Sequence, residues 1–302
     1  MTNAWPVSDR PGGPDRLMAS LALRPLVKRE TLGTRTRGVM DRIERWVPGR
    51  RTVAREIPEL GLTYLLPTHS LLGRLIRRYG MYEEHIINWI VSRQDALAGG
   101  VFVDVGANIG WYTALFAKLA GKSGRVFAFE PDPTNFAVLA DMLRRNVLAA
   151  DLHQAAVGEA AGEGVLNLGH SGNPGSHTML PGQYSEGKVA VPIVSLDTTV
   201  LPALDAARPI DLLKMALEGY ELAAMKGAPL LLARTRNVVV EFSPALMRSA
   251  GIVPGELITL LVDQGFSIRR FRFDQPPTAI APEALLGVDA PEQCDLLFSR
   301  DA

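Results

Sequence analysis

The sequence is poor in cysteine, in net charge and in long apolar runs. Its single cysteine, Cys294, excludes an internal disulfide and predicts a reduced, buried thiol. The 32 basic and 32 acidic residues cancel, so the charge balance favours neither a nucleic-acid partner nor an anionic membrane surface. No apolar run approaches the ~20 residues that span a bilayer, and the first residues lack the pattern of a signal peptide. We therefore expect a cytoplasmic protein that binds neither nucleic acid nor membranes.

Two parts of the chain differ in composition. Residues 1–60 are predicted to be an N-terminal extension that is disordered where Pro, Gly and Asp are frequent, then Arg-rich and helical to about residue 53. The arginines could face an anionic partner, but a solvated helix face is the favoured interpretation. Residues 61–302 are predicted to form the main domain, in which Leu62–Pro67 has the pattern of a strand or hairpin arm.

The main domain alternates short apolar runs with amphipathic segments. Strands are expected at residues 101–106, 125–130, 153–158, 210–214, 237–242, 267–273 and 294–299. Helices are expected at residues 83–97, 111–119, from 133 onward, 215–226 and 254–265. This alternation is typical of a parallel sheet covered on both faces. Residues 162–194 interrupt it and predict an antiparallel excursion, with a glycine-rich loop that holds His170 and His177 over a pocket.

The most informative motif is DVGANIGWYT, Asp104–Thr113, where the first strand meets the first helix. Ligands bind at this carboxyl edge in doubly wound sheets. A dinucleotide-binding loop would have glycines where Asn108 and Trp111 stand, and a phosphate loop with Gly-Lys-Ser/Thr is absent. Glu130 ends the next strand, where an acid can accept hydrogen bonds from both hydroxyls of a ribose. The two motifs predict a nucleoside ligand without a pyrophosphate.

Four segments, FVDVGANIGWYT, FAFEPDP, AAVG and LLKMALEGYELAAMKGA, occur in this order between about Tyr82 and Ser299. Together they resemble the FkbM-type S-adenosylmethionine-dependent methyltransferases. The resemblance implies an α/β, class I methyltransferase (Rossmann-like) fold, whose seven-stranded, mostly parallel sheet has helices on both faces and an antiparallel last strand. It does not cover the N-terminal extension.

The resemblance also implies S-adenosyl-L-methionine as cofactor and assigns residues to each of its parts. The residues implied at the methionine part are Asp104, Gly106, Ala107, Asn108 and Gly110, with Glu83 near the amino group. Those implied at the ribose are Glu130, Pro131, Asp132 and Asn135, and those implied at the adenine are Ala155, Ala156 and Val157. For Glu83, a charge on a surface helix is an equal alternative.

One position departs from the family pattern. This pattern reads Lys-x-Asp-x-Glu-Gly; Lys214, Glu218 and Gly219 match it, while Ala216 stands at the aspartate position. An aspartate could act as a base or a metal ligand, and alanine can do neither. Three interpretations stay open: a substitution introduced to trap or test the enzyme, a natural alanine with another proton-accepting group, or a chain that binds the cofactor without transferring the methyl.

Several groups are candidates for the catalytic chemistry. Lys214 is a candidate site cation, and the candidate proton acceptors are Glu218, His177, His170 and Glu241. Glu218 could instead cap the following helix, and His177 could simply be solvated. The sequence shows no cluster of His, Cys and carboxylates that defines a metal site, so Mg²⁺ would depend on the missing aspartate.

These features predict an S-adenosylmethionine-dependent O-methyltransferase that acts on a hydroxyl of a small molecule, with activity weakened by Ala216. A sugar, a polyketide or another secondary metabolite of natural product biosynthesis is the expected acceptor. The alternatives are an inactive cofactor-binding homologue that serves a partner protein and, disfavoured by the glycine spacing, a nicotinamide dehydrogenase. The N-terminal extension is expected to close the acceptor pocket or to form a homodimer, because Trp46 and its apolar neighbours need burial.

Overall fold

The structure, a computed structural model, describes residues 52–170, 173–183, 185–273, 275–287 and 291–300. The predicted helical extension up to residue 51 lies outside the described residues. The rest of the predicted N-terminal extension is not helical. It contains β1 (Thr52–Ile57), a strand that pairs antiparallel with β2 (Leu62–Pro67). The predicted hairpin arm at Leu62–Pro67 is therefore confirmed, and a domain boundary at residue 60 would divide this hairpin.

The centre of the fold is an eight-stranded sheet with the order β12-β11-β13-β10-β9-β3-β4-β5. Its strands are β3 (Val101–Val105), β4 (Arg125–Phe129), β5 (Asp151–His153), β9 (Leu212–Met215), β10 (Asn237–Phe242), β11 (Ser267–Arg272), β12 (Gln275–Ala279) and β13 (Cys294–Ser299). The strands β5, β4, β3, β9 and β10 are parallel, and β13 runs antiparallel between β10 and β11.

The expectation of seven strands was wrong by one. The additional strand, β12, forms a hairpin with β11 at the edge of the sheet. It contains Pro276 and Pro277, and proline is tolerated at such an edge because no neighbouring strand needs its missing N–H.

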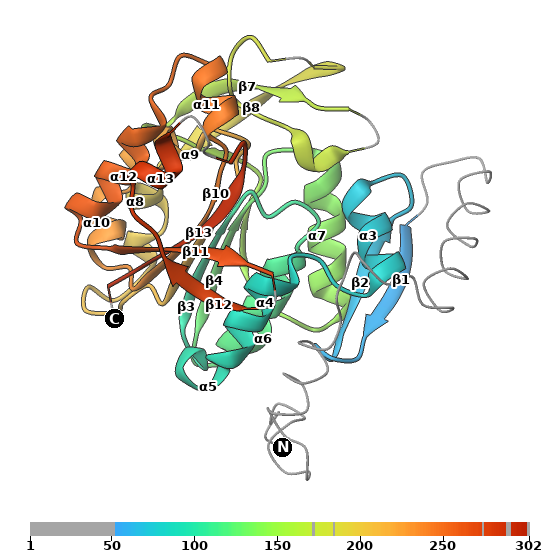
Figure 1. The fold of residues 1–302 in the computed structure, drawn as a ribbon. Coiled ribbons are helices and arrows are strands. Elements are labelled where there is room, and N and C mark those ends of the chain that lie inside the picture. Colours follow the sequence, from blue (N-terminus) through green and yellow to red (C-terminus); the bar gives the residue numbers. More distant parts are fainter. Residues whose placement is uncertain (1–51, 171–172, 184, 274, 288–290, 301–302) are drawn as a thin grey trace.

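Helices cover both faces of the sheet (Figure 1). One face is covered by α4 (Glu84–Ser92), α5 (Gln94–Leu97), α6 (Trp111–Ala120) and α7 (Pro133–Arg145), while α3 (Leu71–Tyr79) packs on the β1-β2 hairpin. The other is covered by α8 (Leu196–Thr199), α9 (Glu221–Lys226), α10 (Pro229–Ala233), α11 (Pro244–Ser249), α12 (Pro254–Asp263) and α13 (Glu283–Leu286). Successive side chains of a strand alternate between these two cores, as Phe102 and Val103 do. Within the described ranges, no helix has the length and apolar character needed to cross a membrane.

A small second sheet lies beside the carboxyl ends of the parallel strands. It has the order β6-β8-β7 and consists of β6 (Ala156–Val157), β7 (Gly162–Leu168) and β8 (Gly187–Val194), with the short 3-10 helix η1 (Pro174–Ser176) in the loop between β7 and β8. A second such turn, η2 (Leu201–Ala203), follows α8. The antiparallel pairing of β7 and β8 confirms the predicted excursion. The single strand predicted at 153–158 is divided between β5 and β6, which belong to different sheets.

Gly110 shows how tightly the turn between β3 and α6 is packed. Its φ is 85°, and a Cβ at this position would lie 2.4 Å from Met142 Cε and 2.5 Å from Leu139 Cδ1 of α7. We expect Gly110→Ala to lower the free energy of unfolding by about 2–4 kcal/mol, from left-handed backbone strain and overpacking together. The measurement is urea unfolding followed by circular dichroism.

Gly251→Ala is the matched control for this prediction. Gly251 has a φ of 76°, but a Cβ there would meet no atom within 4 Å. In this variant only the left-handed backbone strain should lower the free energy of unfolding, by about 1 kcal/mol. Equal losses in the two variants would contradict the packing argument.

Candidate functional site

A first pocket lies at the carboxyl ends of β3, β4 and β9. We call it the Glu130 pocket. The predicted residues that line it are Gly106, Asn108, Glu130, Pro131, Asn135, Ala155, Ala156, Val157, His177 and Ala216. Segments far apart in the sequence thus meet at one edge of the sheet, as the parallel topology requires.

Glu130 is the principal acid of this pocket. Its side chain is buried; Oε2 accepts a hydrogen bond from the Asn108 amide at 2.7 Å, and Oε1 accepts one from the Asp132 amide at 2.9 Å. Burial raises the pKa of Glu130 to about 7, although both amide bonds act in the opposite direction. Each carboxylate oxygen has two lone pairs, so Glu130 can still accept hydrogen bonds from two ligand hydroxyls.

Three predicted cofactor residues have other roles. Gly110 lines neither the Glu130 pocket nor the second pocket described below. It has no side chain because α7 packs directly against it. Asp104 is fully buried and accepts a hydrogen bond from Thr113 Oγ1 at 2.6 Å, so it fixes the start of α6. Asp132 caps α7 by accepting from the Thr134 and Asn135 amides, as its position before a proline predicts.

The opposite wall of the Glu130 pocket was missed by sequence reasoning. Leu166, Met179 and Tyr220 line it together with Ala155–Val157. These side chains come from the small sheet and from the turn before α9, and no local motif marks them. Together they form an apolar slot next to the acid of Glu130.

A second pocket adjoins the first. We call it the Lys214 pocket; Gly106, Asn108, Gly175 and Ala216 line both. Besides Asn108, its polar lining consists of Tyr82, Glu83, Tyr112, Asn173, Lys214, Glu218, Glu241 and Gln293. Its apolar lining includes Leu71, Leu72 and Leu75 of α3, and Trp111 and Ala107 at the start of α6.

Sheet register brings the charged groups of the Lys214 pocket together. Lys214 pairs with Val239 across β9 and β10, so Glu241, two residues later, projects from the same face. Glu241 is in turn directly opposite Asp295 of β13. The segment before α4 adds Glu83, whose Oε2 accepts from Tyr112 at 2.5 Å. Glu83 therefore lies in the Lys214 pocket, beside and not within the Glu130 pocket.

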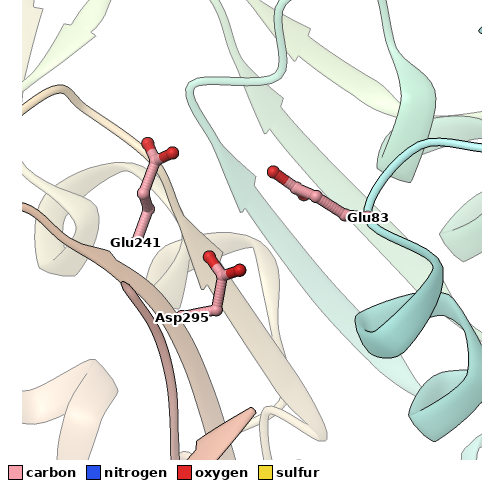
Figure 2. Close-up of side chains that lie close together, drawn as sticks. All are labelled: Glu83, Glu241 and Asp295. Carbon is pink, nitrogen blue, oxygen red and sulfur yellow. The ribbon is translucent and has the colours of Figure 1, made fainter. Parts of the chain in front are cut away.

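Figure 2 shows Glu83, Glu241 and Asp295 around a common space. One carboxylate oxygen of each lies within 4.8 Å of the others, which is close enough for a shared metal ion. The sequence does not indicate this grouping, which arises only in the fold. The three residues are far apart in the sequence, and only the pairing of β10 with β13 unites two of them.

Glu218 has a free carboxylate in the Lys214 pocket. Burial raises its pKa to about 7, while the charge of Lys214 opposes this shift. The suggested capping role belongs to another residue: Glu221 Oε1 accepts from the Leu217 amide at 2.6 Å and from the Gly219 amide at 3.4 Å. Glu218 is thus available to a ligand.

The histidines lie away from the Lys214 pocket. His177 lines the Glu130 pocket, where its Nδ1 accepts from the Gly169 amide at 3.0 Å and burial lowers its pKa. His170 lies 3.5 Å from the carboxylate of Glu186 and is largely exposed. His85 binds Asp295 through Nε2 at 2.7 Å. Neither loop histidine is therefore placed to accept a proton from a group bound beside Lys214.

Comparison with known proteins identifies the family of the chain. Residues 104–268 match the model of the methyltransferase FkbM domain. The chain is 31% identical over 204 residues to methyltransferase sdnD of Sordaria araneosa, which covers 58% of this chain and 76% of that protein.

The solved structures that match the chain share little sequence with it. Methyltransferase FkbM from Methylobacillus flagellatus has 16% identity and a TM-score of 0.41; the match covers 74% of this chain but only 54% of that one. An rRNA methylase from Streptococcus thermophilus has 14% identity, the same TM-score, and coverage of 72% and 98%. The match of residues 104–268, more than half of the sequence, shows that the chain belongs to the FkbM family of S-adenosylmethionine-dependent methyltransferases.

Proposed function

We propose that this protein methylates a hydroxyl group of a small molecule, such as a sugar, a polyketide or another secondary metabolite. The observation that carries the proposal is the junction of the two pockets at Gly106 and Ala216. A cofactor in the Glu130 pocket and an acceptor in the Lys214 pocket would meet there. Methyl transfer needs such in-line positioning of donor and acceptor.

The residues of the Glu130 pocket fit S-adenosylmethionine. Glu130 keeps acceptor capacity for the ribose hydroxyls, and the apolar slot of Ala155–Val157, Leu166 and Met179 suits the adenine. Asn108 and Gly106 would hold the methionine part near the junction. When bound, the cofactor supplies a methyl group that its sulfonium charge already activates.

Lys214 and Glu218 would act on the acceptor. The Lys214 ammonium can donate to the acceptor oxygen and stabilise the negative charge that develops on it. Glu218 can take the hydroxyl proton, because a carboxyl with a pKa of about 7 is half ionised near neutral pH. The leucines of α3 and the rings of Tyr82 and Trp111 give the pocket an apolar side, which favours an acceptor with both apolar and hydroxyl parts.

Ala216 supports the alternative of a homologue that binds the cofactor without turnover. Its methyl group lies at the junction of the pockets, where the family pattern has a carboxylate. In this alternative the protein would serve a partner protein. Glu218 favours the active enzyme over this alternative, because it offers a proton acceptor in the same pocket.

The test is a mass-spectrometric screen of hydroxylated acceptors with isotope-labelled methyl donor. We expect a product that gains one methyl group on oxygen, and we expect Lys214→Met to lower its formation by about 10²- to 10³-fold. Binding of S-adenosylhomocysteine should be unchanged in this variant. The control is Lys188→Met, which changes an exposed lysine of β8. Methylation on nitrogen or carbon, or full activity of Lys214→Met, would contradict the proposal.

A further inference from the structure

The three carboxylates of Glu83, Glu241 and Asp295 have the spacing of a coordination sphere. Oxygen ligands lie about 2.0–2.1 Å from Mg²⁺ and about 2.3–2.6 Å from Ca²⁺, so ligands across such an ion are about 4–5 Å apart. The ligand oxygens of these three residues all fall within 4.8 Å of one another. They come from the N-terminus of α4, from β10 and from β13, and they face one space (Figure 2).

Each carboxylate is oriented by a separate neighbour. Tyr112 donates to Glu83, Gln293 donates to Glu241, and His85 Nε2 lies 2.7 Å from Asp295 Oδ2. Glu83 has Tyr82 as a second hydrogen-bonding neighbour. Each carboxylate oxygen has two lone pairs, so these bonds leave acceptor capacity for a ligand. Outer hydrogen bonds of this kind are typical of metal-binding carboxylates.

The three carboxylates outnumber the one positive charge that Lys214 places beside Glu83 and Glu241. Glu241 and Asp295 are directly opposite each other on antiparallel strands, where like charges are destabilising. In the described ranges, none of the three forms an ion pair with lysine or arginine.

Lys214 independently indicates a ligand in the same pocket. Its side chain is only 8% exposed and lines this pocket with Glu83 and Glu241. The ammonium lies 5.0 Å from the centre of the Tyr112 ring, and the described part of the chain offers it no hydrogen bond or ion pair. An ammonium has three donors, so Lys214 is suited to bind an oxygen of a ligand in this pocket.

We propose that Glu83, Glu241 and Asp295 bind a divalent cation that prefers oxygen ligands, and that an oxygen of the acceptor bridges this cation and Lys214. The cation neutralises the excess of carboxylates, and the bridging oxygen supplies the acceptor that the ammonium lacks. A cation bound to a hydroxyl also lowers the pKa of this hydroxyl. The bridging oxygen rests on the proposed function, whereas cation binding by the three carboxylates does not.

The experiment uses the full chain, freed of metal by chelation, and Mn²⁺ as the probe. Electron paramagnetic resonance measures free Mn²⁺ during titration at neutral pH, without cofactor or acceptor. We expect one saturable site, with affinity lowered about 10- to 100-fold by Glu241→Gln and by Asp295→Asn. Glu163→Gln, an exposed acid of β7, is the matched control and should bind Mn²⁺ normally. Lys214→Met should bind Mn²⁺ at least as tightly as the native chain, because it removes a neighbouring positive charge.

The metal proposal is overturned if no Mn²⁺ binds up to about 1 mM, the weak end of protein affinities for such cations. It is also overturned if both carboxylate variants bind Mn²⁺ like the native chain while circular dichroism shows them folded. Methyl transfer that persists in excess chelator would support the proposed function and show that the cation takes no part in the reaction. The two failures are therefore distinguishable.

Discussion

Replacing Ala216 with aspartate is expected to raise the rate of methyl transfer to a hydroxyl acceptor by roughly 10²- to 10⁴-fold, the usual range for a positioned proton acceptor. Ala216 directly follows β9 and lines both pockets. Its side chain can neither accept a proton nor bind a metal ion. A carboxylate at this point would reach the place where acceptor and cofactor meet. Single-turnover rates with labelled methyl donor measure the effect.

Ala216→Asn is the control, because it has the shape of aspartate without the charge. It should remain as slow as the native chain, and both variants should bind S-adenosylhomocysteine alike. An aspartate variant no faster than the asparagine variant would mean that position 216 takes no part in moving the proton. Glu218 would then be the remaining proton acceptor of the Lys214 pocket.

Replacing Glu130 with glutamine is expected to weaken binding of S-adenosylhomocysteine by roughly 10- to 100-fold at pH 8, because hydrogen bonds to a charged group are lost. The difference in affinity between the native chain and Glu130→Gln should become smaller toward pH 6. Glu130 has a pKa of about 7 in the folded protein, so lowering the pH neutralises it and makes it resemble glutamine. Affinity of the native chain should therefore rise with pH through about 7 while that of Glu130→Gln stays level. Isothermal titration at several pH values measures both.

Glu163→Gln serves again as a control, since its side chain is exposed on β7. It should reproduce the native pH profile. A native profile without any change between pH 6 and pH 8 would show that the charge of Glu130 does not hold the ribose.

The Glu130 pocket could be predicted from the sequence because its signals are local. The apolar runs at 101–106 and 125–130 become β3 and β4, and the turns that follow them carry Asn108 and Glu130. Asp132 before a proline marks the start of α7 correctly. Each of these inferences needs only the order of neighbouring residues and the rule that ligands bind at the carboxyl ends of parallel strands.

The cluster of Glu83, Glu241 and Asp295 beside the Lys214 pocket depends on long-range strand pairing that local patterns do not show. Asp295 joins the site because β13 inserts antiparallel between β10 and β11, which places it opposite Glu241. The segment at 153–158 is short and mixed, so its composition could not indicate that it divides between two sheets. Gly110 looked like part of a ligand loop, because a glycine required by packing and one required by a ligand look identical in a sequence.

The segment that matches the family runs from residue 104 to residue 268, but two of the three clustered carboxylates lie outside it. Glu83 precedes this segment and Asp295 follows it. If the proposed acceptor site is correct, relatives could differ in these flanking segments, and so in acceptor, while the segment from 104 to 268 keeps the same pattern. Chimeras that trade only residues 52–100 and 291–300 between relatives would transplant acceptor choice without disturbing the donor.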